Sequence, residues 1–190
     1  MLKVKNNMIK ELLKKTETGT VIRRDILENQ VRSIYLGIGS NLGNKKKNIE
    51  KAKFELIKKK IKIIKSSSYY ESLSWPNPDN PKFLNIVLEV QSSLTPINLI
   101  KKCKEIEIDL GRVKSSKNSP RICDIDIIDY KRQIKRSKIF LPHQRMHCRN
   151  FVLLPLFEIN KDWVHPISKV HIKSLILSLP NRDIRSIKQI

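Results

Sequence analysis

The order of strand-like and helix-like segments after Val31 limits the possible folds more than any other feature of the sequence. Runs rich in β-branched and aromatic residues predict strands, and apolar residues spaced three to four apart predict helices. Strands are expected over residues 31–38, 61–70, 82–90 and 122–130, and helices over residues 49–57 and 96–110, with short ones near 150–158 and 170–179. This order predicts an α+β sandwich, with helices on one face of a largely antiparallel sheet.

The chain divides into a polar N-terminal stretch and one larger unit. Residues 1–30 are polar and mixed in charge, and we expect an extension there that is partly helical or disordered. Residues 31–190 carry the periodic apolar patterns. A unit of this size buries enough surface to fold without a disulfide or a metal ion. Residues 31–190 are therefore expected to form a single domain.

The net charge of +21 at pH 7 is the most unusual feature of the composition. Basic chains bind nucleic acids, anionic membranes or phosphorylated substrates. Of the 39 basic residues 28 are lysine, while isoleucine occurs 28 times and alanine once, a skew typical of an AT-rich genome. The basic residues are spread along the whole chain, without the block of like charges that marks a binding tail. The charge by itself therefore does not indicate a nucleic-acid partner.

Apolar runs and cysteines indicate the compartment. The longest run without a charge or a hydroxyl group is residues 151–157, about a third of the length that crosses a bilayer. The N-terminus lacks the apolar region of a secretory signal. Cys103, Cys123 and Cys148 are an odd set without C-x-x-C spacing, which favours reduced thiols. We expect a cytoplasmic protein with neither a membrane nor a nucleic-acid partner.

Gly37 and Gly39 follow the first expected strand and precede a helix, where two explanations compete. A dinucleotide-binding turn would need a third glycine at position 42, which is Leu42, and an acidic residue about 20 positions further on. A tight strand-to-helix turn, with Ser40 or Asn41 near the helix cap, needs neither. We favour the tight turn.

Asp124 and Asp126 alternate with isoleucines in the last long strand. Because successive side chains in a strand point to opposite faces, both carboxylates are expected on one face, with Ile125 and Ile127 on the other. Two such carboxylates repel each other and resist desolvation, so a cation must compensate them. Carboxylates at this spacing suit one or two Mg²⁺ ions that also take phosphate oxygens. The alternative is an exposed edge strand whose acids are solvated or paired with lysines.

Basic side chains and histidines surround the acidic pair. Those that precede and follow it are Arg112, Lys114, Lys117, Arg121, His143, Arg145, His147 and Arg149. Cations close to a metal–carboxylate centre are expected where a polyphosphate lies between them, although a solvated basic loop gives the same pattern. The two histidines and the adjoining Cys148 are also compatible with a zinc site, but no H-E-x-x-H motif is present.

Aromatic residues are scarce, and several lie in or beside expected loops and helix starts. These are Tyr69, Tyr70, Trp75, Phe83 and Phe151. They are either core residues or a stacking slot for a flat heterocycle. The segment 72–81 is expected to be a loop, because its prolines and asparagines are incompatible with regular structure.

Several of these segments together resemble the 6-hydroxymethyl-7,8-dihydropterin pyrophosphokinase family, over roughly residues 33–180. The resemblance rests on YLGIGSNLG from Tyr35 to Gly43, Phe83-Leu84-Asn85, Glu107 ahead of Gly111-Arg112-Val113, Pro120-Arg121-x-x-Asp124-Ile125-Asp126, Leu141-Pro142-His143, Arg149-x-Phe151-Val152-Leu153-x-Pro155-Leu156 and Val164-His165-Pro166. The arginine-x-x-Asp-x-Asp segment with the downstream Pro-His is specific, whereas the glycine segment alone is not. The resemblance implies a ferredoxin-like α+β sandwich.

The resemblance also implies an ATP- and Mg²⁺-dependent diphosphotransferase of folate biosynthesis. Such an enzyme moves pyrophosphate from ATP to the hydroxymethyl group of 6-hydroxymethyl-7,8-dihydropterin and releases AMP. By resemblance, Asp124 and Asp126 hold two Mg²⁺ ions, and Arg112 and Arg121 neutralise the transferred group. The implied ATP-binding residues are Glu107, Lys114 and His143, and the implied pterin-binding residues are Ser72, Trp75, Phe83, Asn85, Arg149 and Phe151. Loops 72–81 and 112–120 are expected to close over the substrates, and the expected form is a monomer.

The sequence departs from the family pattern in several places. Lys114 replaces an arginine, Asn118-Ser119-Pro120-Arg121 replaces Trp-Gly-Pro-Arg in a loop about one residue shorter, Gln144 replaces a tyrosine, and Phe83 replaces a tyrosine. None of these changes removes the acidic pair, so activity is expected. One alternative is a nucleic-acid-binding protein on the same scaffold, although the aromatic strand of RNA-recognition modules is absent. The other is a catalytically inactive relative of the enzyme.

Overall fold

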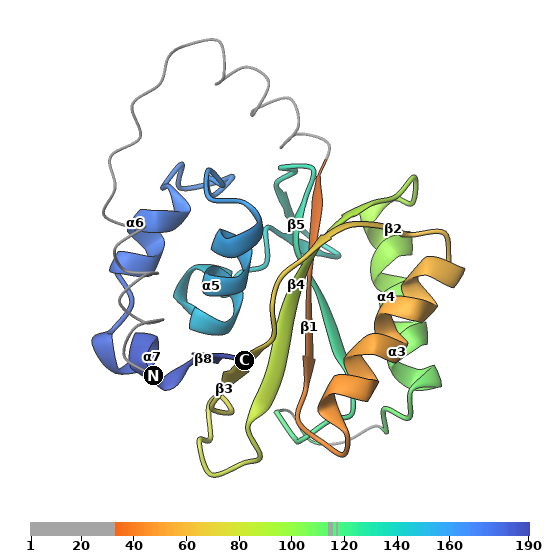
Figure 1. Cartoon of the computed structure of the whole chain (residues 1–190). Helices are drawn as coiled ribbons and strands as arrows, with labels where there is room; N and C mark the ends of the chain where they lie inside the picture. The colour runs from red at the N-terminus through yellow and green to blue at the C-terminus, as the bar shows by residue number, and fades with distance from the viewer. Residues whose placement is uncertain (1–32, 114–115, 117) are drawn as a thin grey trace.

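A six-stranded sheet forms the centre of the molecule (Figure 1). The structure is a computed structural model that describes residues 33–113, 116 and 118–190. The strands of the sheet are β1 (Ile34–Ser40), β2 (Lys62–Ser66), β3 (Tyr70–Ser72), β4 (Phe83–Gln91), β5 (Asp124–Tyr130) and β8 (Lys188–Gln189). Their order is β5-β1-β4-β3-β8, β2 also pairs with β4, and all of these pairs are antiparallel. The expected antiparallel sheet is confirmed.

Helices cover both faces of this sheet. They are α3 (Lys45–Lys58), α4 (Pro96–Asp109), α5 (Asn150–Ile159), α6 (Ile172–Leu177) and α7 (Asn181–Ser186), with a 3₁₀ turn η1 (Met146–Cys148) and a small hairpin of β6 (Lys135–Arg136) and β7 (Phe140–Leu141). Figure 1 shows α3 and α4 on one side of the sheet, and α5 and α6 on the other. The α+β sandwich is confirmed, but the expectation that helices lie on one face holds only for α3 and α4.

Each face of the sheet has its own apolar core. In the first core, Ile34 and Leu36 of β1 pack with α3 and α4. In the second, Tyr35 of β1 and Val87 of β4 pack with Leu153 and other residues of the C-terminal helices. This division follows from the alternation of side chains along β1, because neighbouring positions point to opposite faces.

The helix boundaries follow local capping chemistry. Thr95 caps α4 by accepting a hydrogen bond from Asn98 N at 3.3 Å, and Pro96 occupies the first turn. The helix ends before Gly111, whose φ of +98° is accessible to glycine at little cost. These features confirm the helix expected from Thr95-Pro96 to Gly111. The cap of α3 is Asn44, which accepts from Lys47 N at 3.0 Å, and not Ser40 or Asn41.

A bulge in β5 decides which of its side chains share a face. Tyr35 pairs with Asp129 and Leu36 pairs with Ile127, so Ile128 is an extra residue. Asp129 is therefore turned into the second core, where it accepts a hydrogen bond from Trp163 Nε1 at 3.0 Å.

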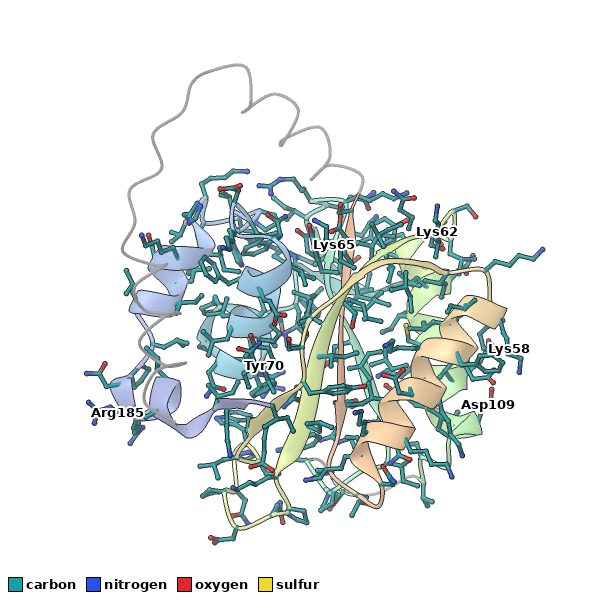
Figure 2. All side chains as sticks on the ribbon, viewed as in Figure 1. Lys58, Lys62, Lys65, Tyr70, Asp109 and Arg185 are labelled. Atoms are coloured by element: carbon teal, nitrogen blue, oxygen red, sulfur yellow. The ribbon has the colours of Figure 1, made fainter. Side chains whose placement is uncertain are left out.

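The side chains complete this arrangement. Figure 2 shows Tyr70 between the sheet and α5, and the Tyr70 hydroxyl donates to Glu158 Oε2 at 2.8 Å. Within the described part of the chain, no helix is long and apolar enough to cross a membrane. The expected extension, residues 1–30, lies outside the described residues, so the division of the chain into an extension and a domain stays a prediction.

Candidate active site

A cavity of about 500 Å³ lies against the face of the sheet formed by β5, β1 and β4. Its volume is in the range of small-molecule sites. The predicted site residues that line it are Arg112, Arg121, Asp124, Asp126, Ser72, Trp75, Phe83, Asn85, His143, Arg149 and Phe151. Glu107 is not among the lining residues, and Lys114 lies outside the described residues. The fold thus brings together side chains from four separate segments of the sequence.

Two glycines in the middle of β1 make the floor of the cavity. Gly39 pairs with Asp124 on one side and Asn85 on the other. A Cβ at Gly39 would come within 3.0 Å of Asn85 Oδ1 and 3.2 Å of Phe83 Cδ1. The absence of a side chain therefore keeps the floor open. The expected tight turn at Gly37 and Gly39 is wrong, because both lie within the strand and the positive φ belongs to Gly43.

Asp124 and Asp126 face this cavity from β5, while Ile125 and Ile127 are in the first core. The expected alternation is present. Among the described residues, no group of three or more histidine, cysteine or acidic side chains could hold a metal ion. Two carboxylates that need further oxygen ligands from substrate and water fit Mg²⁺, which keeps such ligands in nucleotide sites. Metal binding by these two residues stays a prediction.

The two arginines assigned to the transferred group are both bonded to Asp124. Arg112 Nη1 donates to Asp124 Oδ1 at 2.9 Å, and Arg121 Nη1 donates to Asp124 Oδ2 at 3.2 Å. Arg112 also contacts Glu107. The carboxylates raise the pKa of Arg112 in spite of its burial, which acts in the opposite direction. In this structure Arg112 and Arg121 thus share the carboxylate of Asp124.

Glu107 lies behind this cluster and not beside the open cavity. Its side chain is 1% exposed. Oε1 accepts from Lys104 Nζ at 2.6 Å and from Ile125 N at 2.6 Å. Through these contacts and its contact with Arg112, Glu107 ties α4 to the start of β5. The ATP-binding role expected for Glu107 stays a prediction. In the structure Glu107 holds Arg112 and the start of β5 in place.

His143 closes the end of the cavity near Asp126. Its backbone N–H donates to Ile128 O at 2.8 Å, which attaches the segment to β5. His143 Nε2 lies 3.9 Å from Asp126 Oδ2. Burial lowers the pKa of His143, Asp126 opposes that shift, and Arg149 and Arg145 add to it. The imidazole is therefore neutral near pH 7 and can accept a proton when negative charge enters the cavity.

Aromatic rings line the cavity next to these charged groups. Phe83 begins β4 and Phe151 is the second residue of α5, and both line the cavity. The Arg121 guanidinium carbon is 5.8 Å from the Phe83 ring centre, and that of Arg149 is 5.4 Å from the Phe151 ring centre. Burial and neighbouring Arg145 lower the pKa of Arg149. Rings paired with guanidinium groups present flat surfaces to a planar ligand.

Asn85 offers a directed polar group between these rings. Its Nδ2 donates to Ser72 Oγ at 3.0 Å and to Tyr70 O at 3.3 Å. Its carbonyl oxygen is the atom closest to the space above Gly39. Asn85 can therefore accept a hydrogen bond from a ligand while its donors are held by β3.

Gly39, Lys104 and Arg145 are among the cavity residues to which the sequence assigns no role. The sequence pattern predicts a turn at Gly39, does not distinguish Lys104 from the many other lysines, and marks Arg145 only as a cation near the acidic pair. The Arg145 guanidinium carbon is 5.0 Å from the Trp75 ring centre, and Arg149 lies 5.6 Å from the same ring. The glycine spacing on a strand was the one signal that could have identified the floor.

The zinc alternative has no support in the described residues. His143 lines the main cavity and a second one of about 450 Å³, which His147 and His165 also line. Cys148 is exposed, whereas Cys103 and Cys123 are buried, and all three thiols are free. Burial raises the pKa of Cys103 and of Cys123 to about 12. The expectation of reduced cysteines agrees with these positions.

Comparison with known proteins identifies the family. A family model described as 7,8-dihydro-6-hydroxymethylpterin-pyrophosphokinase (HPPK) matches residues 35–161, more than half of the chain. The chain belongs to the HPPK family. The matched span contains every predicted site residue, and the predicted family is confirmed.

HPPK relatives differ widely in length. The chain is 40% identical over 163 residues to the folic acid synthesis protein fol1 of Pneumocystis carinii, which covers 84% of this chain and 22% of that protein. It is 39% identical over 142 residues to the 2-amino-4-hydroxy-6-hydroxymethyldihydropteridine pyrophosphokinase of Aquifex aeolicus, covering 74% of this chain and 88% of that protein. The chain thus spans about a fifth of the length of the first curated relatives that it matches.

Solved HPPK structures share the fold. The Plasmodium falciparum HPPK-DHPS structure with pterin and p-hydroxybenzoate has a TM-score of 0.66 and 16% sequence identity, covering 83% of this chain and 46% of that chain. At this identity the likeness concerns the fold alone. It agrees with the predicted ferredoxin-like α+β sandwich.

Proposed function

We propose that the chain transfers pyrophosphate from ATP to the hydroxymethyl group of 6-hydroxymethyl-7,8-dihydropterin, in folate biosynthesis. One observation carries the proposal. A single cavity is lined both by two carboxylates with several cations and by two aromatic rings with an amide. Membership of the HPPK family and the names of the relatives support the same reaction.

The pterin binds between the aromatic rings. Phe83 and Phe151 stack on the two faces of its ring system, and the carbonyl oxygen of Asn85 accepts from an N–H on its edge. Ser72 holds the Asn85 amide, and Trp75 with Arg149 borders the slot. Water is excluded where the ring is bound, and the hydroxymethyl group extends toward β5.

The ATP phosphates bind beside the two carboxylates and the arginines. Asp124 and Asp126 are the residues that would hold Mg²⁺, which when bound neutralises phosphate oxygens and lowers the barrier to attack. Arg112 and Arg121 turn from Asp124 to the transferred phosphates, where a guanidinium can bind two oxygens at once. His143 gains a proton as negative charge approaches. Lys114 lies outside the described residues, and its contact with ATP is part of the same proposal.

The chemistry is a displacement at phosphorus. The hydroxymethyl oxygen of the pterin attacks the β-phosphorus of ATP, and the bond from that phosphorus to the oxygen shared with the α-phosphorus breaks. AMP leaves with that oxygen, and the alcohol proton passes to solvent. Because such reactions need little covalent help, the residues accelerate the reaction by orientation and charge neutralisation.

An assay of the purified protein tests the proposal. With ATP, Mg²⁺ and 6-hydroxymethyl-7,8-dihydropterin, we expect AMP to appear in step with loss of the pterin alcohol. Release of ADP instead would indicate transfer of one phosphoryl group. Binding of both substrates without AMP would favour an inactive relative. Tight, salt-sensitive binding of RNA or DNA without AMP would favour the nucleic-acid alternative.

A further inference from the structure

Asn41 joins the two loops that border the cavity. It directly follows the last residue of β1, and it is 3% exposed. One of the loops, residues 73–82, connects β3 to β4 and carries Trp75. The other leads into β5 and carries Arg121. The two ends of the Asn41 amide bond to different loops.

The carbonyl end of the amide holds Arg121. Asn41 Oδ1 accepts from the backbone N–H of Arg121 at 2.7 Å, and the backbone N–H of Asn41 donates to the Arg121 carbonyl oxygen at 3.1 Å. Both backbone polar groups of Arg121 are thus bonded to one residue. The base of a side chain that reaches Asp124 is therefore fixed.

The nitrogen end of the amide holds the Trp75 loop. Asn41 Nδ2 donates to Pro81 O at 3.0 Å and to Ser74 Oγ at 3.4 Å. Ser74 Oγ donates to the same Pro81 oxygen at 2.7 Å. These contacts connect the two ends of the loop. Ser74 precedes Trp75 and Pro81 lies two positions before Phe83, so they also set the position of two aromatic cavity residues.

We propose that Asn41 is a positioning residue that couples the nucleotide end of the cavity to the pterin end, a role that rests on the proposed function. The amide is planar, so a shift of the Arg121 backbone on polyphosphate binding is passed to Pro81 and Ser74. Each substrate then binds more tightly in the presence of the other. Such coupling is reciprocal, and it commonly changes affinity by about 5- to 150-fold.

The variant Asn41→Asp distinguishes the contribution of the amide nitrogen from that of the amide oxygen. It keeps the shape and the acceptor for Arg121 N, but it replaces the donor to Pro81 O with a second oxygen. Asn44→Asp is the matched control, since it makes the same chemical change at the exposed cap of α3, where an acceptor is all that is needed. Ser74→Ala is a second test that introduces no charge and weakens the same contact.

Calorimetry measures the coupling directly. The affinity for 6-hydroxymethyl-7,8-dihydropterin is determined with and without the Mg²⁺ complex of an ATP analogue that has a methylene group between the α- and β-phosphorus atoms. We expect the analogue to strengthen pterin binding at least about fivefold in the unmodified protein and in Asn44→Asp. The coupling ratio is the pterin affinity with the analogue divided by the affinity without it. In Asn41→Asp this ratio falls to within about twofold of one, and in Ser74→Ala it lies between this value and that of the unmodified protein.

The possible results separate this role from the proposed function. An unmodified protein that binds both ligands and releases AMP, but shows no coupling, overturns the role of Asn41 alone. The same holds if coupling survives unchanged in both Asn41→Asp and Ser74→Ala. If Asn41→Asp does not fold, Ser74→Ala decides between the two outcomes. A protein that binds neither ligand overturns the proposed function itself.

Discussion

Arg112 Nη1 donates to Asp124 Oδ1 at 2.9 Å, whereas the neighbouring carboxylate on the same face, Asp126, is 40% exposed and faces His143 Nε2 at 3.9 Å. The two carboxylates therefore differ in how readily they can bind a metal ion. Asp124 already has cationic partners that must move before a metal ion binds, and Asp126 is open to the cavity. Removal of Asp124 would also disturb the arginines, so Asp126 is the cleaner place to test the acidic pair.

Asp126→Asn should lower kcat for AMP release on the order of a thousandfold. The amide keeps the size of the side chain but removes a charge, and loss of metal-assisted charge neutralisation costs several kcal/mol in the transition state. The circular dichroism spectrum and the melting temperature should stay close to those of the unmodified protein, because Asp126 is not part of either core.

Asp109→Asn is the control for this change, since Asp109 lies at the surface end of α4 (Figure 2). Its rate should match that of the unmodified protein. Mn²⁺ binding in the presence of the ATP analogue, followed by electron paramagnetic resonance, gives a readout that does not depend on turnover. Full activity and full Mn²⁺ affinity in Asp126→Asn would rule out this carboxylate as a metal ligand.

Gly39→Ala should weaken pterin binding about tenfold to a hundredfold. The new Cβ would lie 3.0 Å from Asn85 Oδ1 and 3.2 Å from Phe83 Cδ1, and overpacking of this kind costs about 1–3 kcal/mol. The affinity for the ATP analogue should change much less. Fluorescence titration of the pterin measures the first quantity and calorimetry the second.

Gly37→Ala is the matched comparison on the same strand. Its Cβ would meet Ile128 Cδ1 at 3.2 Å, the flexible end of a side chain that can yield. We expect a smaller loss of pterin affinity than in Gly39→Ala. Equal losses in the two variants would mean that the floor of the cavity does not define the pterin slot.

Local patterns in the sequence were sufficient for the elements that depend on local chemistry. Thr95-Pro96 and Gly111 mark the two ends of α4 because a cap and a left-handed residue act within a few positions. The alternation around Asp124 and Asp126 places both acids on one face because the strand period is two. These features need no knowledge of the rest of the chain.

Contacts between distant segments could not be predicted in the same way. Helix α5, which begins at Asn150, is apolar around most of its surface, which indicates burial but not which face of the sheet it covers. Gly39 is part of the floor only because Asp124 and Asn85 come from other strands to lie beside it. The ion pair of Arg112 with Glu107 and the hydrogen bonds of Asn41 to two loops likewise depend on tertiary structure.

Phe151→Ala should weaken pterin binding about tenfold to a hundredfold and change ATP binding little. Stacking of a flat heterocycle on an aromatic ring contributes about 1–3 kcal/mol. Phe151→Tyr keeps the ring and should restore most of the affinity. Phe54→Ala, at an exposed position on the outer face of α3, should have no effect on either ligand. If Phe151→Ala weakened ATP and the pterin equally, the ring would support the whole site instead of forming the slot.

Asp129 should make the stability of the protein fall as pH rises through the mildly acidic range. This carboxyl group is 1% exposed, and burial raises its pKa to about 6 in spite of hydrogen bonds from Trp163 and Arg132. The ordinary pKa of aspartate, near 4, applies to the unfolded chain. A pKa that is higher in the folded state means that protonation favours folding. The stabilisation is therefore full below about pH 4 and is lost as pH rises through about 6.

Asp129→Asn cannot ionise, and comparison with it isolates this effect. The free energy of unfolding is measured by denaturant titration of both proteins between pH 4 and pH 7. The value for the unmodified protein minus that for Asp129→Asn should decrease over this range by up to roughly 3 kcal/mol. The amide oxygen can replace only one of the two carboxylate oxygens that accept from Arg132 N and Trp163 Nε1. This cost does not depend on pH, so only the slope matters. A difference that increases with pH would show that the Trp163 and Arg132 donors outweigh burial and keep Asp129 ionised in the folded protein.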